Sequence, residues 1–393
     1  MGRLLVVGLI SFLTLVDLFA AQAILPELVA AYHTTPAMMG VAVNASTIGM
    51  AVAGIVVALF SRELDRRRGI WISLALLAIP TALLASAPDI TWFMALRIAQ
   101  GLCMATAFTL TMAYLAEQSG ADDTANALAA YVTGNVMSNL VGRVMAAAVT
   151  DSIGLRGNFY AFAALNLAGA ALVYFGLART EPMRAMTKTM GGPLSVLRSH
   201  LRNPALRTSF GIGFLILFAF IATFTYVNFV LVRSPISLSM MAVGLVYFVF
   251  VPSVITTPFA GYLVRRVGVR PAFLGGIIVA LAGLPLLLLD RLEPILEGLV
   301  LVGAGTFFAQ AVATGFVGRA AATDRAAASG IYLACYYVGG IAGSVVPGAL
   351  FQQFGWPACV AATAAALLLA VILGIALKLP DPAALAAPRT VEP

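Results

Sequence analysis

Long apolar segments alternate with short polar breaks along almost the whole chain. Each segment is close to the roughly 20 residues that a helix needs to cross a bilayer. The pattern predicts twelve membrane-spanning helices. They lie at about 4–26, 38–60, 70–88, 91–115, 126–149 and 158–178, and then at about 208–232, 240–263, 272–289, 295–318, 328–350 and 356–377.

One polar break is much longer than the others, and it runs from Arg179 to Arg207. It separates six predicted helices from six more, as two related halves require. We therefore expect an all-α membrane protein with two pseudo-symmetric six-helix halves. The predicted parts are an N-terminal bundle at 1–178, a cytoplasmic linker at 179–207, a C-terminal bundle at 208–378 and a cytoplasmic tail at 379–393.

Composition agrees with this pattern and excludes a soluble core. Of the 393 residues, 61% are hydrophobic and 10% are charged, against about 45–50% apolar residues in soluble domains. The three cysteines lie in apolar segments without metal-binding spacings, so we expect no metal and no cofactor. The net charge of +7 is spread over short loops, which argues against a nucleic-acid partner.

The positive charges also predict an orientation. Eighteen of the 23 Lys and Arg residues fall in loops on one side of the predicted spans, whereas only Arg156, Arg233 and Arg291 fall on the other. Cytoplasmic loops are enriched in positive charge. The sequence therefore predicts a multi-pass protein of the bacterial inner membrane with both termini in the cytoplasm.

Three ionisable residues, Asp17, Arg97 and Arg143, lie inside predicted spans at a similar depth. Buried charges are costly and usually functional, and a carboxylate and two guanidiniums should pair. We expect proton coupling if Asp17 loses its arginine partner in one conformational state and then takes up a proton. Two alternatives stay open: a static structural bridge, and an excess positive charge that attracts an anionic substrate.

Small residues recur every four positions along the fifth predicted span, which is typical of close helix contact. A polar ridge runs beside this stripe and faces either a neighbouring helix or a central cavity. The eleventh span repeats the pattern, as related halves predict. The stripe of the fifth span is Ala130, Gly134, Ser138, Gly142 and Ala146, its ridge is Asn135, Asn139 and Arg143, and the eleventh span has Cys335, Gly339, Gly343 and Pro347.

A mostly apolar pocket with a few polar groups suits a small organic ligand. Polar side chains in the spans are therefore candidates for substrate binding, although such groups also bond to neighbouring helices. The candidates are Asn44, Asn135, Asn139, Thr223, Tyr226, Asn228, Gln310 and Tyr336.

Two loops resemble the signature G-x-L-A-D-R-x-G-R of the major facilitator superfamily. The first, SRELDRRRG at 61–69, keeps the aspartate as Asp65, and the second, GYLVRRVGVR at 261–270, has Arg265 in its place. Arg97 begins RIAQG, which resembles the family motif R-x-x-Q-G, whose arginine is associated with proton coupling in exporters. The family's antiporter motif G-x-x-x-G-P-x-x-G-G is matched only in part, since Asn139 replaces its proline.

Three further stretches resemble one bacterial subgroup of this family: 131–143, the run Tyr336-Tyr337-x-Gly339 and the run Phe354-Gly355-Trp356. This subgroup is the twelve-helix drug/proton antiporter-like group, which includes arabinose or multidrug efflux permeases. The resemblance implies alternating access by rocking of two halves, with Asp65, Arg66 and Arg266 as gating residues at the inner side. It implies a proton-coupled exporter of a small drug-like or sugar-like compound. The expected partners are the substrate, protons and the lipid bilayer, and the expected state is a monomer.

Two other functions stay open: an uptake permease for a small organic anion, and a transport-like sensor. An enzyme is not expected. The two histidines, His33 and His200, fall on opposite sides of the predicted membrane, and no serine or cysteine has a base at a readable spacing.

Overall fold

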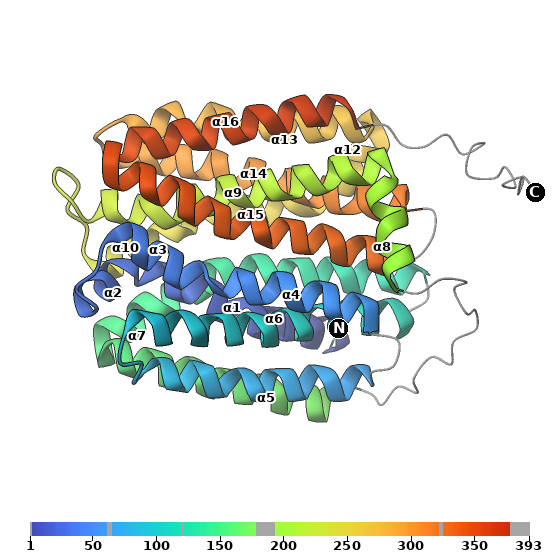
Figure 1. Ribbon diagram of the computed structural model, residues 1–393, viewed down its shortest axis with the longest axis horizontal. Helices are drawn as coiled ribbons and strands as arrows, with labels where there is room; N and C mark the ends of the chain where they lie inside the picture. The colour runs from blue at the N-terminus through green and yellow to red at the C-terminus, as the bar shows by residue number, and fades with distance from the viewer. Residues whose placement is uncertain (1, 61–64, 119–120, 178–192, 322–324, 378–393) are drawn as a thin grey trace, which may run out of the picture.

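The computed structural model describes residues 2–60, 65–118, 121–177, 193–321 and 325–377 (Figure 1). The N-terminal half begins with α1 (Gly2–Ala23), which the short α2 (Leu25–Ala31) connects to the second span. That span consists of α3 (Pro36–Asn44) and α4 (Ser46–Phe60), and it is followed by α5 (Arg66–Leu84), α6 (Ile90–Gln118) and α7 (Ala121–Gly176).

The C-terminal half follows α8 (Pro193–Arg202) and begins with α9 (Pro204–Leu231). Its second span is broken into short helical pieces, of which the first is α10 (Met240–Val246) and the last is α12 (Ala260–Val267). Between them lie η2 (Tyr247–Phe250), α11 (Val251–Thr256) and η3 (Thr257–Phe259). The remaining spans are α13 (Val269–Gly283) with η4 (Pro285–Leu288), α14 (Leu292–Ala320), α15 (Arg325–Phe354) and α16 (Trp356–Ile375).

Helix α7 contains two spans rather than one. A straight helix of its 56 residues would be about 84 Å long, far more than the roughly 30 Å of bilayer hydrocarbon. The chain turns at Gly154, where φ is 74° and ψ is 175°, a conformation that favours glycine. Eleven helices of the described chain are long and apolar enough to cross a membrane, so with α7 counted twice the twelve predicted spans are confirmed.

The small-residue stripes pack as the sequence predicts. A Cβ atom added to Gly134 would collide with the carbonyl oxygen of Gly8, so α7 lies directly against α1. In the other half, a Cβ atom on Gly339 would collide with the carbonyl oxygen of Phe214, so α15 lies against α9 in the same way. Equivalent contacts in both halves give the fold its internal symmetry.

Several helices begin where the sequence supplies a capping side chain. Thr35 accepts a hydrogen bond from the backbone nitrogen of Met38 at 3.2 Å, and Ser239 accepts one from Ala242 at 3.3 Å. Both caps lie at the end of the molecule that also holds α2, called here the α2 end (Figure 1). They fix the points at which the chain re-enters the bundle.

The opposite end, called the α8 end, carries most of the arginines of the described loops. Arg67 and Arg68 open α5 there, and Arg265 and Arg266 close α12. The first residues of α1 and the last residues of α16 also lie toward this end (Figure 1). The predicted boundary between the halves lies in this region, but residues 179–192 of the predicted linker and the whole predicted tail, 379–393, lie outside the described residues.

The two halves face each other across the middle of the bundle. Helices α3 and α4 contact α15, and α7 contacts α10. In Figure 1 the first half occupies the lower layer and the second half the upper layer, with α4 and α15 at their boundary. Polar side chains from both halves meet near this boundary.

Candidate transport site

A cavity of about 510 Å³ lies between the halves. Its walls come from α1, α4, α6 and α7 of the first half and from α9, η3, α14 and α15 of the second. Thr314 and Val317 on α14 and Ser329 on α15 place part of the wall near the α8 end. The lining includes no Asp, Glu, Lys, Arg or His among the described residues.

Four of the predicted substrate-binding residues line this cavity: Asn135, Asn139, Gln310 and Tyr336. Gln310 Oε1 accepts a hydrogen bond from the hydroxyl of Tyr332 at 2.8 Å. The remaining wall is mainly aromatic and aliphatic. The sequence therefore identified polar groups from both halves that face one common space.

The other four predicted residues, Asn44, Thr223, Tyr226 and Asn228, do not line it. All are buried, with at most 1% of their surface exposed. Asn44 Nδ2 donates to Thr225 Oγ1 at 3.2 Å, Tyr226 donates to the carbonyl oxygen of Ser344 at 2.6 Å, and Asn228 Nδ2 donates to the carbonyl oxygen of Gln22 at 3.0 Å. Asn44, Tyr226 and Asn228 thus join helices on the α2 side of the cavity.

Asp17 is buried on α1, with 3% of its surface exposed. Its Oδ1 accepts hydrogen bonds from Thr81 Oγ1 and Gln100 Nε2, each at 3.3 Å. Its Oδ2 has no hydrogen-bond partner in the described part of the chain. Asn166 Nδ2 donates to Thr81 Oγ1 at 3.1 Å, so α1, α5, α6 and the second span of α7 supply the surroundings of this carboxyl group.

Arg97 lies next to Asp17 without the ion pair expected from the sequence. Its Nη1 donates to the main-chain oxygen of Asp17 at 3.1 Å and to Gln100 Oε1 at 2.7 Å. Because arginine is only a donor, Gln100 must turn its oxygen to Arg97 and its nitrogen to Asp17. Among the described residues, Gln100 thus stands between the guanidinium and the carboxyl group.

The rest of the Arg97 guanidinium is also hydrogen-bonded. Nε donates to the carbonyl oxygen of Val43 at 2.8 Å, and Nη2 donates to Ser46 Oγ at 3.1 Å and to the carbonyl oxygen of Leu18 at 3.4 Å. All five donors of the side chain therefore have acceptors. The acceptors all belong to the first half.

Arg143 is not a partner of Asp17 in this structure. Its Nε donates to Asn139 Oδ1 at 2.9 Å, and its Nη2 donates to Gln22 Oε1. Its carbon Cζ lies 4.1 Å from the ring centroid of Tyr247. The expected cluster of one acid and two arginines is thus two separate clusters, since helix packing turns Asp17 and Arg143 toward different neighbours.

Sequence reasoning missed the neutral residues that complete these clusters. Gln22, Thr81, Gln100 and Asn166 are each fully or nearly fully buried, at 0–1% exposure. Their signal is visible in the sequence, because polar side chains are rare within apolar spans. Thr81 and Gln100 are direct hydrogen-bond partners of Asp17, Gln100 is also one of Arg97, and Gln22 is one of Arg143.

The predicted gating residues lie at the α8 end. Asp65 caps α5, since its Oδ1 accepts a hydrogen bond from the backbone nitrogen of Arg68 at 2.9 Å, and its Oδ2 lies 3.6 Å from Arg68 Nε. Arg66 is buried, whereas Arg266 is exposed and lies 5.7 Å from the ring centroid of Tyr262. Residues 61–64 of the same loop lie outside the described chain.

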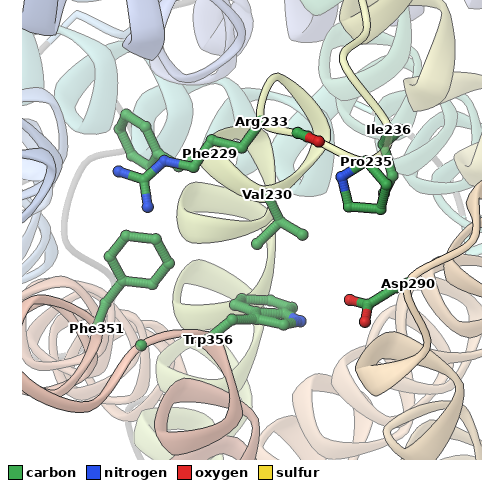
Figure 2. A pocket seen from close by; sticks show the side chains of 10 residues that line it. Phe229, Val230, Arg233, Pro235, Ile236, Asp290, Phe351 and Trp356 are labelled. Carbon is green, nitrogen blue, oxygen red and sulfur yellow. The ribbon is translucent and has the colours of Figure 1, made fainter.

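A second, smaller hollow of about 150 Å³ lies at the α2 end of the C-terminal half (Figure 2). Arg233 lies over the ring of Phe351 on one side of it, with 5.7 Å to the centroid, and Asp290 lies on another side. Trp356, which also lines the hollow, donates a hydrogen bond from Nε1 to the carbonyl oxygen of Leu287 at 2.7 Å. None of the described residues that line this hollow also lines the larger cavity.

A twelve-span bundle of two similar halves around a shared central cavity defines the chain as a membrane transport protein. The family model of the Major Facilitator Superfamily matches residues 7–252 and 231–393. The chain therefore belongs to the Major Facilitator Superfamily. It is a multi-pass secondary transporter and not an enzyme.

Known proteins of this family resemble the chain over nearly its full length. The MFS-type transporter YybF of Bacillus subtilis (strain 168) is 25% identical over 375 residues, which is 94% of this chain and 93% of YybF. The inner membrane transport protein YnfM of Escherichia coli (strain K12) is 28% identical over 91% of this chain and 86% of YnfM.

Among solved structures, a bacterial homologue of the human lysosomal transporter Spinster, in an inward-facing and occupied conformation, has the same fold. Its TM-score is 0.72 at 15% identity, over 95% of this chain and 93% of that one. The shared fold extends to both halves.

Proposed function

We propose that this protein exports a small uncharged organic compound in exchange for protons. The observation that carries the proposal is Asp17, a membrane-buried carboxyl group that the described structure surrounds with neutral hydrogen-bonding groups. Its Oδ1 has two donors, and its Oδ2 has none among the described residues. A buried carboxyl group that makes no direct ion pair can gain or lose a proton when its surroundings change, which is the property a proton carrier needs.

Gln100 provides a route by which conformation can control that proton. In the described state the amide separates Asp17 from Arg97. If α1 shifts against α6 within the first half during the transport cycle, the guanidinium can approach the carboxyl group directly and stabilise its ionised form. Asp17 then releases its proton in one state and takes it up in the other. Arg97 tunes the carboxyl group and does not itself carry the proton.

The proposed substrate follows from the cavity wall. Its lining is aromatic and aliphatic with few polar groups, and the described lining has no charged side chain. Such a surface favours an uncharged amphipathic compound. Asn135 and Asn139 from one half and Gln310 and Tyr336 from the other can hydrogen-bond to its polar atoms. The substrate would then touch both halves.

A partial similarity supports a drug-like compound. The chloramphenicol resistance protein of Streptomyces lividans is 26% identical over 210 residues, which is 53% of each chain. Chloramphenicol is itself uncharged and amphipathic. It is therefore a suitable probe.

The proposed direction rests on the arginine distribution. The α8 end carries Arg67, Arg68, Arg265 and Arg266, so we assign it to the cytoplasm of a bacterial inner membrane. The cavity wall reaches toward this end, at Val317 and Ser329, so a substrate can bind from the cytoplasm. Asp65 at the same end is the proposed gating residue, together with Arg66 and Arg266. The working unit is proposed to be a monomer in the lipid bilayer.

The rival hypothesis of anion uptake has less support. It needs an arginine that can attract the substrate, and Arg143 is fully buried and does not line the cavity. Arg97 uses all its donors within its own half. These contacts favour an uncharged ligand.

The test uses inside-out membrane vesicles, in which export becomes accumulation of labelled chloramphenicol in the lumen. An acidic lumen should drive accumulation by the parent protein. Asp17→Asn should abolish this response, because an amide group cannot bind and release a proton as a carboxyl group does. Asp89→Asn is the control, since Asp89 caps α6 on the protein surface. An unchanged proton response in Asp17→Asn would remove the coupling assignment, and a parent protein that ignores chloramphenicol would contradict the choice of substrate.

A further inference from the structure

Arg143 lies among aromatic rings that come mainly from the opposite half. Its Cζ is 4.1 Å from the ring centroid of Tyr247, 5.7 Å from that of Phe250 and 6.0 Å from that of Phe224. All three rings belong to the second half, whereas Phe19 of the first half lies at 5.7 Å. A guanidinium within about 6 Å of a ring face is attracted to it. The buried charge is therefore stabilised across the boundary between the halves.

A chain of hydrogen bonds crosses the same boundary. Gln22 accepts from Arg143 through Oε1 and donates from Nε2 to Asn44 Oδ1 at 2.7 Å. Asn44 donates onward to Thr225 of the second half at 3.2 Å, and Asn228 of that half donates back to the carbonyl oxygen of Gln22 at 3.0 Å.

Tyr247 joins the rings to this chain, because its hydroxyl donates to Asn228 Oδ1 at 2.6 Å. The ring beneath the guanidinium and the bonds around Gln22 thus form one connected cluster. In the described part of the chain, the cluster lies on the α2 side of the cavity and links α1, α3 and α7 to α9 and η2.

From this arrangement we propose that Arg143 is the positioning residue that holds the α2 end of the transporter closed. Separation of the halves at that end would remove its guanidinium from the rings of Tyr247, Phe250 and Phe224. It would also break the bonds of Asn44 and Asn228 across the boundary. When this end opens, the Arg143 guanidinium must therefore exchange the rings for other partners, such as water molecules. Closure restores its contacts with the rings.

The same residue connects this closure to the cavity. Arg143 Nε donates a hydrogen bond to Asn139 Oδ1, and Asn139 lines the cavity. Its Nδ2 has no hydrogen-bond partner among the described residues. While the α2 end is closed, Arg143 thus orients the Asn139 amide so that its Nδ2 group can donate a hydrogen bond to another acceptor.

Accessibility of the cavity from the α2 end tests the proposal without any substrate. Ile221→Cys, in a background that lacks Cys103, Cys335 and Cys359, places one thiol in the cavity wall. In intact cells a membrane-impermeant maleimide reaches this thiol only when the α2 end opens. Arg143→Gln should raise the labelling rate about tenfold over the parent, because the open population rises. Equal rates in a folded Arg143→Gln protein would overturn the proposal.

A second pair of variants keeps the test valid if Arg143→Gln does not fold. Tyr247→Phe retains the ring and loses the hydroxyl, whereas Tyr247→Leu loses both. Labelling should increase in the order parent, Tyr247→Phe, Tyr247→Leu. Phe248→Leu is the matched control on the neighbouring residue, since 53% of the Phe248 surface is exposed, and it should label like the parent. Equal rates for the two Tyr247 variants would exclude the ring as the holding contact.

This proposal extends the proposed function and can fail separately from it. Labelling depends on how often the α2 end opens, and the measurement needs neither chloramphenicol nor an imposed proton gradient. Unchanged labelling together with proton-driven export would remove the role of Arg143 alone. Faster labelling without proton-driven export would remove the proton coupling alone.

Discussion

Two fully buried arginines of this transporter are stabilised in opposite ways. Arg97 places all five of its donors on acceptors of α1, α3, α4 and α6, within one half. Arg143 has two hydrogen-bonded nitrogens, an Nη1 without a hydrogen-bond partner among the described residues, and aromatic rings from the other half. The first arrangement survives a rigid-body motion of the halves, whereas the second does not. A buried charge can thus serve either a fixed framework or a contact that exists in one state only.

The largest effect should come from Arg97→Gln, the change that breaks the fixed framework. Several buried acceptors would lose their donor at once, at a cost of roughly 3–5 kcal/mol, so vesicle export should fall by about 100-fold or more. Arg97→Lys should recover part of it, since an ammonium group supplies three donors. The labelling rate at position 221 should stay near that of the parent, and an increase as large as that of Arg143→Gln would erase the distinction between the two arginines.

A smaller effect is expected from Gln100→Leu, which removes the amide between Asp17 and Arg97. Loss of the three buried hydrogen bonds that the Gln100 side chain makes to Arg97, Asp17 and Thr81 should cost at least about 1.5 kcal/mol, which corresponds to a roughly tenfold slower proton-driven export. Thr106→Val serves as the control on the same helix, because Thr106 bonds only to its own helix at the carbonyl oxygen of Leu102 in the described chain. Normal export by Gln100→Leu would show that the amide has no part in coupling.

The smallest expected effect is the energetic coupling between the Asp17 cluster and the Arg143 cluster. Asp17 and Arg143 share no hydrogen-bond partner in the described part of the chain, so the effects of Asp17→Asn and Arg143→Gln on labelling should add within about 0.5 kcal/mol. Labelling rates of the two single variants and the double variant measure this. A strong deviation from additivity would mean that the Asp17 cluster and the Arg143 cluster act directly on each other.

The sequence predicted the spans well because membrane insertion depends on segment hydropathy. The predicted span at 208–232 corresponds to α9 at Pro204–Leu231, and the span at 356–377 corresponds to α16 at Trp356–Ile375. The small-residue stripes also predicted close helix contact, and Gly134 and Gly339 lie where α7 packs on α1 and α15 packs on α9. Only a residue without a side chain allows helices to approach so closely.

The candidate site was predicted less completely. Asn135, Asn139, Gln310 and Tyr336 line the cavity, while Asn44 and Asn228 join helices beside it. All of them are polar residues in apolar spans, and their sequence pattern does not separate the two groups. The separation depends on the rotation of each helix about its axis. In a bilayer both the lipid-facing and the buried face are apolar, so hydropathy hardly specifies that rotation.

By itself, the sequence determined the number of spans, their division into six and six, and the burial of Asp17, Arg97 and Arg143. These follow from segment length and from the cost of charge in hydrocarbon, which are local properties. The tertiary structure alone decided that Gln100 stands between Asp17 and Arg97 and that Arg143 meets Tyr247. Residues at equal depth become partners only when packing turns their helices toward each other, and packing depends on all the helices together.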